Sequence, residues 1–190
     1  MLTDHPGKAL LFFALPMIFG NLFQQLYNTV DAIIVGRFVG KQALASVGGS
    51  SAVLTNFVIE FFTGLSAGAT VVISQFYGAR DLKRLSKGLH TAYAFSIAAS
   101  ILISVVGWFA TPSLLHLLKT PADVIPDSIL YLRIYFLGII FTLIYNMGSS
   151  IMRAVGDSRR PLMYLVVCCV INIILDIVLV IGFRMGIAGA

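Results

Sequence analysis

The sequence predicts an all-α integral membrane protein with about five transmembrane helices. Of its 190 residues, 58% are hydrophobic and only 11% are charged, whereas about a quarter of the residues of a soluble domain are charged. Its apolar runs exceed the ~20 residues that cross a ~30 Å hydrocarbon layer, and most basic residues lie between these runs. The predicted spans are residues 9–35, 46–79, 91–118, 128–152 and 161–183.

The first run contains a single formal charge, Asp31, preceded by amides at helical spacing. Asn21, Gln24, Asn28 and Asp31 stand at i, i+3, i+7 and i+10, which gathers them within about 80° of one helix face. Lipid offers these groups no partners, so the face must line a protein interior or a water-filled cavity. The amides alone are equally compatible with interhelical hydrogen bonding. No basic residue at i±4 can pair with Asp31, which favours a functional carboxylate.

The second and third runs differ in their charge. Glu60 is the only charged residue between Gln42 and Ala79. It lies about 17 residues from Tyr77, which at the helical rise predicts a position near the outer boundary, where a carboxylate is expected to be solvated. The third run carries no charge, and Trp108 lies toward its outer end, as an interfacial aromatic would.

The fourth and fifth runs begin with recognisable boundary residues. Arg133 lies near the entrance of the fourth and is interpreted as an interfacial anchor. Pro161 opens the fifth, at a helix start, where its missing N–H costs little. The fifth run contains one acid, Asp176.

Asp31 and Asp176 are expected to lie at similar depths, in the outer half of the bilayer, because each follows the start of its helix by about 15–22 residues. Asn172 precedes Asp176 by four residues and projects from the same helix face. Together the three residues would form an all-oxygen cluster suited to a hard monovalent cation or to a shared proton. The alternative is that each acid is satisfied by a separate pocket of water.

The distribution of basic residues predicts the orientation. Two dense clusters, residues 80–87 and 153–160, fall on the side of the membrane that also holds the N-terminus, which indicates a cytoplasmic N-terminus. We interpret the net charge of +5 as an orientation signal and predict no nucleic-acid partner. The odd number of predicted spans indicates an unfinished bundle.

Four segments, in order, resemble the multidrug and toxic compound extrusion (MATE) family. They are ALPMIF with Asp31 and the following VGRFVG, then GLSAGATVVISQFYGARD, then YLRIYFLGIIFTLIYNMGSSIMRAVGDSRRP, and finally INIILDIVLVIG. The likeness covers essentially the whole chain.

The resemblance implies an antiporter of twelve helices in two lobes, which exports organic cations and other amphipathic drugs in exchange for Na⁺ or H⁺. Residues 1–190 would form an incomplete N-terminal lobe, with the second lobe absent. Asp31, Asn172 and Asp176 match the family's cation site, and the coupling ion is the only cofactor expected. The resemblance also implies a multi-pass protein of a bacterial plasma membrane.

The proposed cargo cavity of this transporter is lined partly by Gln24, Tyr27 and Asn28. The mechanism expected is that occupancy of the cation site changes helix packing around Pro16 and favours rocking of the two lobes. No catalytic residue is predicted.

Three other classes of membrane protein share some of these features. A lipid-linked oligosaccharide flippase of the same superfamily would share the helix count, but it usually needs a more cationic cavity. An intramembrane aspartyl protease also needs two acids, yet Gly156 and Asp157 belong to a basic loop and no glycine precedes Asp176. A membrane fragment that does not transport would be favoured only by the short chain.

Overall fold

The computed structural model describes residues 6–189, which are entirely helices and their connections. The expected all-helical fold is therefore confirmed. The α-helices are α1 (Pro6–Ile34), α2 (Lys41–Gly48), α3 (Ser50–Gly78), α4 (Leu82–Leu117), α5 (Ile125–Ala154) and α6 (Arg159–Asp176). Wider π-helical segments extend α1 over Val35–Val39 and α6 over Ile177–Gly182, and a 3-10 turn covers Gly186–Gly189.

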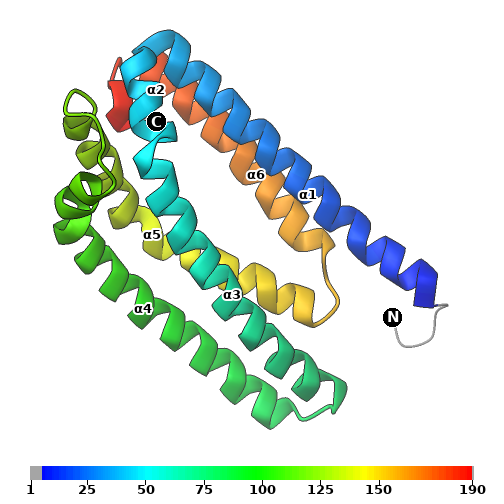
Figure 1. The fold of residues 1–190 in the computed structure, drawn as a ribbon. Coiled ribbons are helices and arrows are strands. Elements are labelled where there is room, and N and C mark those ends of the chain that lie inside the picture. The colour runs from blue at the N-terminus through cyan, green and yellow to red at the C-terminus, as the bar shows by residue number, and fades with distance from the viewer. Residues whose placement is uncertain (1–5, 190) are drawn as a thin grey trace.

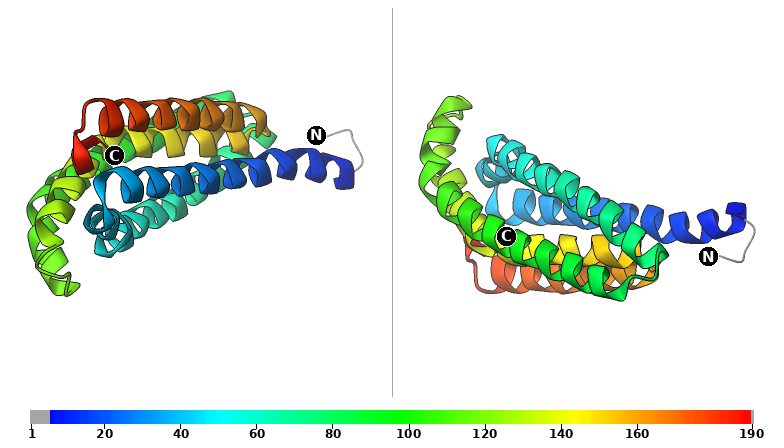
Figure 2. Two further views of the ribbon diagram at one scale, coloured as in Figure 1. Left: turned by 90° about the horizontal axis from the view of Figure 1, so that it is seen from above. Right: turned by 90° about the horizontal axis from the view of Figure 1, so that it is seen from below.

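Four helical stretches are long and apolar enough to cross a membrane. They are Lys41–Gly78, Leu82–Leu117, Ile125–Ala154 and Arg159–Gly182. The first predicted span, α1, is not among these four stretches of the described residues. Its 29 residues nevertheless make a helix of about 43 Å, and it lies beside α6 over most of its length (Figures 1 and 2).

The helices form two groups. α1 and α6 make one pair, and α3, α4 and α5 pack together on the other side (Figure 1). The second group holds the main apolar core, whose fully enclosed residues are Phe62, Leu115, Leu132, Phe136, Ile139 and Leu143. Gly107 of α4 permits the closest approach, since a Cβ there would lie 2.5 Å from the ring of Phe136. The cavity described below lies between the two groups.

The two loops at the basic end use the same capping device. The Oδ1 atom of Asp81 accepts the backbone N–H of Arg84 at the start of α4, at 3.0 Å. Asp157 likewise accepts the N–H groups of Arg159 and Arg160 at the start of α6. α4 therefore begins at residue 82, nine residues before the predicted span. A capped helix can continue through a charged segment, because basic side chains there remain solvated outside the membrane.

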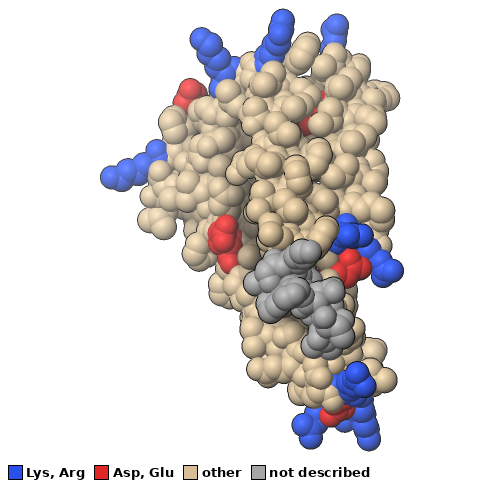
Figure 3. Space-filling view, turned by 90° about the vertical axis from the view of Figure 1, so that its right-hand side faces the viewer, with Lys and Arg blue, Asp and Glu red and all other residues tan. Residues whose placement is uncertain are grey.

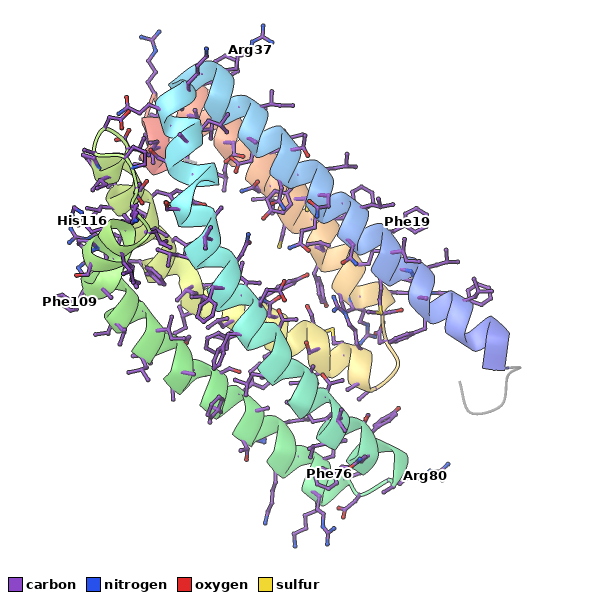
Figure 4. All side chains as sticks on the ribbon, viewed as in Figure 1. Phe19, Arg37, Phe76, Arg80, Phe109 and His116 are labelled. Atoms are coloured by element: carbon purple, nitrogen blue, oxygen red, sulfur yellow. The ribbon has the colours of Figure 1, made fainter. Side chains whose placement is uncertain are left out.

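The exterior is divided into an apolar band and two charged ends. Large apolar side chains point outward along the helices, among them Phe19 and Phe109, which are 50% and 75% exposed (Figure 4). Lys and Arg project from the two ends and also from the flanks of the view in Figure 3, with Arg37 and Arg80 at opposite ends (Figure 4). Such a band is stable only where lipid covers it.

Arg133 joins α5 to α4 within this band. Its guanidinium lies over the ring of Trp108, 5.2 Å from the centroid, in the geometry of a cation–π contact. The two residues thus stabilise the packing of two helices as a pair, in addition to the interfacial positions that the sequence predicts for each.

Candidate functional site

The packing of α1 on α6 brings the two predicted acids to the same depth. Gly20 faces Leu165 so closely that a Cβ there would lie 3.5 Å from its Cδ2 atom. The two helices run in the same direction, and Asp31 and Asp176 each follow these contact residues by eleven positions. Equal rise along two parallel helices therefore sets the carboxylates at one level. They also lie within range of each other's charge.

Three oxygen atoms of the predicted cation site are buried without a hydrogen-bond partner within the described chain. They are Oδ1 of Asp31, Oδ1 of Asn172 and Oδ2 of Asp176. Asp176 is only 3% exposed. Leaving buried polar oxygens unpaired is costly, and burying two like charges together is costlier still. A bound cation or proton would remove most of that cost.

Both acids lie within about one turn of a change in helix geometry. Asp176 is the last residue of α6 before the π-helical segment Ile177–Gly182, and Asp31 stands one turn before Val35–Val39. Wider turns of this kind are frequent at functional sites. No pattern in the sequence predicts these two π-helical segments.

Within residues 6–189, no group of three or more His, Cys, Asp or Glu side chains could hold a metal ion. The predicted cation site of Asp31, Asn172 and Asp176 instead combines two carboxylates with one amide. Oxygen donors of this kind suit a hard cation of low charge and provide no thiolate or imidazole for zinc or copper.

A polar cavity of about 630 Å³ lies between the α1–α6 pair and the α3–α5 group. Gln24, Tyr27 and Asn28 all line it, as does Asn21, so the amide row of α1 faces this space. Asp31 is not among the lining residues. The predicted cargo residues therefore line the cavity, whereas the predicted cation residues are not among its lining residues.

Glu60 lies deeper than its position in the sequence suggests. The Oγ1 atom of Thr70 donates to the carbonyl of Ser150 at 3.5 Å, which sets the register of α3 against the parallel helix α5. Glu60 lies ten residues before Thr70 on α3, and Ile140 lies ten residues before Ser150 on α5. Since Ile140 is the midpoint of Ile125–Ala154, Glu60 lies at mid-height of α5. The expectation of a position near the outer boundary is wrong, because α3 extends inward beyond α5 and Tyr77 is not level with the other helix ends.

Sequence reasoning missed the contribution of α5 to the cavity. Tyr131, Tyr135 and Tyr145 line it, together with Asn146 and Ser149. The three tyrosines are spaced by four and ten residues, and this pattern could have been recognised in the sequence, because it places their rings on one face of an apolar helix. Arg153 lines the inner end of the same cavity.

Comparison with known proteins agrees with this architecture. The model of a protein family described as MatE matches residues 16–178. The chain is 35% identical over 183 residues to the "Probable multidrug resistance protein YpnP" of Bacillus subtilis, covering 96% of this chain and 41% of that protein. It is 26% identical over 189 residues to "Multidrug export protein MepA" of Staphylococcus saprophyticus, covering 96% of this chain and 40% of that protein.

Solved structures give the same result in three dimensions. A MOP superfamily transporter from Pyrococcus furiosus, described as having a binding pocket of reverse polarity, superposes with a TM-score of 0.91 at 27% identity, over 99% of this chain and 41% of that one. The outward-facing conformation of a multidrug resistance MATE family transporter gives 0.90 at 28% identity, over 98% and 41%. The chain thus spans about 40% of the length of the curated relatives it matches.

Proposed function

The chain belongs to the MATE family of multi-pass membrane transporters, which are not enzymes, and from this premise we propose that it forms part of a cation-coupled drug antiporter. In this proposal, cationic and amphipathic drugs leave the cell in exchange for Na⁺ or H⁺. Residues 1–190 supply most of an N-terminal lobe of six helices, and a second lobe completes the transporter. The protein lies in the plasma membrane with its N-terminus in the cytoplasm.

The observation that carries the proposal is the trio of buried, unpartnered oxygens on Asp31, Asn172 and Asp176. An intramembrane carboxylate without a partner is expensive. It is useful in a transporter, because binding and release of a cation change its energy by several kcal/mol. The trio therefore supports a site whose occupancy alternates during a transport cycle.

The separation of the two sets of residues supports the exchange mechanism. The cargo set, Gln24, Tyr27 and Asn28, faces a cavity within the usual range of ~300–1,000 Å³ for small-molecule sites, whereas the cation set does not line this cavity. Both sets depend on α1, so movement of α1 can link them. Pro16 lies within α1 and provides a position where the helix can bend without losing a further hydrogen bond.

The charges of the cavity favour a drug carrier over a lipid-linked oligosaccharide flippase. Arg153 is the sole Lys or Arg that lines the cavity in the described chain, and it lies at the inner end. A pyrophosphate would need several cationic groups at the depth of the cavity. Glu60, at that depth, would repel it.

The test is efflux of a fluorescent cationic dye from cells that express the complete open reading frame encoding the chain. Wild type and Asp31→Asn are compared under an imposed Na⁺ gradient and then under an imposed H⁺ gradient. We expect efflux in wild type under one of the gradients and its loss in Asp31→Asn, with equal amounts of protein in the membrane. Asp127→Asn removes a carboxylate from the first turn of α5, away from both sites, and should transport as wild type does. Unchanged coupling in Asp31→Asn would refute the cation site.

A further inference from the structure

Glu60 is a carboxylate in the middle of a membrane-spanning helix that belongs to neither of the residue sets described above. The side chain of Glu60 is exposed, and it is among the side chains that line the polar cavity. Neighbours on the same face of α3 line the cavity with it, namely Asn56 and Thr63, at spacings of four and three residues. Its side chain is therefore directed into the cavity and away from lipid.

Glu60 has no ion-pair partner within the described chain, where the two salt bridges are those of Asp81 with Arg84 and Asp157 with Arg160. Arg153 is the one cationic side chain that shares its cavity. Arg153 follows Ile140, the residue level with Glu60, by thirteen positions, which corresponds to about 20 Å along α5. Charges so far apart across a hydrated cavity are largely screened, so no cationic side chain of the described residues neutralises this carboxylate.

Aromatic side chains line the same cavity, outward of this carboxylate. Tyr135 lines the same wall five residues outward from the level of Glu60, about 8 Å along the axis. Tyr131 lies one turn further. A carboxylate beside phenol rings recognises a flat cation, because the ring faces attract positive charge and stack on an apolar body.

We propose that Glu60 is the specificity-determining residue for positively charged cargo: it supplies the counter-charge for the cationic centre of a flat amphipathic drug, while the tyrosines of α5 contact the rings. The inference rests on the proposed drug-export function and adds to it the residue that distinguishes a cation from an uncharged or zwitterionic molecule of the same shape. Its role is distinct from that of Asp31, Asn172 and Asp176, which hold the coupling ion.

The experiment measures equilibrium binding of two dyes of similar shape to the purified product of the complete open reading frame. Rhodamine 6G carries a net positive charge, whereas rhodamine B is a zwitterion at neutral pH. Wild type, Glu60→Gln, Glu60→Asp and Asp127→Asn are titrated with each dye, and size-exclusion chromatography verifies that every variant is folded. Asp127→Asn controls for the loss of one negative charge at a position outside the cavity.

We expect Glu60→Gln to raise the Kd for rhodamine 6G about tenfold and to leave the Kd for rhodamine B unchanged. Glu60→Asp should restore most of the affinity for the cation, and Asp127→Asn should bind both dyes as wild type does. Equal weakening of both dyes would show that Glu60 is merely structural, and no change in either would exclude it from the cargo site. Both outcomes would overturn the inference.

Efflux assays separate failure of this inference from failure of the proposed function. If the inference holds, Glu60→Gln still exports rhodamine B under the gradient that drives wild type, whereas Asp31→Asn exports neither dye. If wild type exports both dyes and Glu60→Gln does not alter the preference between them, the antiporter stands and Glu60 has no part in selectivity. If wild type binds neither dye, the drug-export function and the inference are both refuted.

Discussion

Substitution of Asp176 by Asn should have opposite effects on stability in the absence and presence of the coupling ion. In the empty site, Asp176 is 3% exposed and its Oδ2 atom lacks a partner, while Asp31 brings a second negative charge into range. An unsatisfied buried group costs about 1–3 kcal/mol, and more when it is charged. Removing the charge should therefore raise the free energy of unfolding of the ion-free protein, by less than the full penalty because the amide of Asn also needs hydrogen-bond partners.

The effect of Asp176→Asn on stability reverses when the ion binds. A ligand at 100 times its Kd stabilises the folded state by about 2.7 kcal/mol. Asp176→Asn removes one of the two carboxylates and should lose most of this increment. The variant should thus unfold at a higher temperature than wild type in choline chloride and gain much less when NaCl replaces it.

Thermal unfolding in detergent at pH 8, with choline and Na⁺ salts at equal ionic strength, measures both effects. If the proton is the coupling ion, the same measurement is repeated in choline chloride at a series of lower pH values, where H⁺ takes the place of Na⁺ as the stabilising ion. Asp127→Asn is the control, because its carboxylate lies in the first turn of α5, outside the buried cluster. The reasoning is refuted if Asp176→Asn is destabilised equally in both salts, since the carboxylate would then be satisfied without a cation.

Three further substitutions test the packing and the site. Gly107→Ala should lower the free energy of unfolding by about 1–3 kcal/mol through overpacking, because the new Cβ meets the ring of Phe136 at 2.5 Å. The control, Gly138→Ala, places its Cβ where nothing lies within 4 Å and should leave stability unchanged. Equal melting temperatures of the two variants would contradict the prediction. Asp157→Ala should cost about 1 kcal/mol by removing the cap of α6, measured by thermal unfolding with Asp157→Asn as the variant that keeps an acceptor. Asn172→Ala should weaken Na⁺ binding in a titration by about tenfold, corresponding to one lost ligand of ~1.4 kcal/mol, and leave dye binding in Na⁺-free buffer unchanged.

The depth of Asp31 and Asp176 could be estimated from the sequence because of how their helices pack. α1 and α6 run in parallel, with Gly20 against Leu165, so counting residues along each chain gives comparable heights. The same counting failed for Glu60, where the reference residue, Tyr77, belongs to a helix that extends beyond its neighbour. Sequence alone gives distance along a helix, and the register between helices has to come from packing.

The details of the breaks in the helices could not be predicted from the sequence either. The turn after the π-helical end of α1 depends on Gly40, which has a φ of +120°, a conformation that side chains other than hydrogen disfavour. The predicted spans 9–35 and 46–79 leave a connection at Gly40, but they do not predict its backbone conformation. A second break, at Gly49, divides α2 from α3 within the second predicted span, and glycines there do not predict it, because isolated glycines are tolerated within membrane helices.

The heights of the charged residues limit how directly the coupling ion and the cargo can compete. Tyr131 packs against the cluster that contains Val35, and Asp31 lies one turn inward of Val35, so Asp31 is about 8 Å outward of the level of Glu60. At that separation two unit charges interact by about 0.5 kcal/mol in water and about 2 kcal/mol near a protein surface. An ion at Asp31 can therefore weaken a cation at Glu60 by about thirtyfold at most. Strict exchange needs a larger factor, about 10⁴ to reverse a two-state equilibrium. In the proposed antiporter, most of the coupling must then come from the movement of α1, which contributes to both sites.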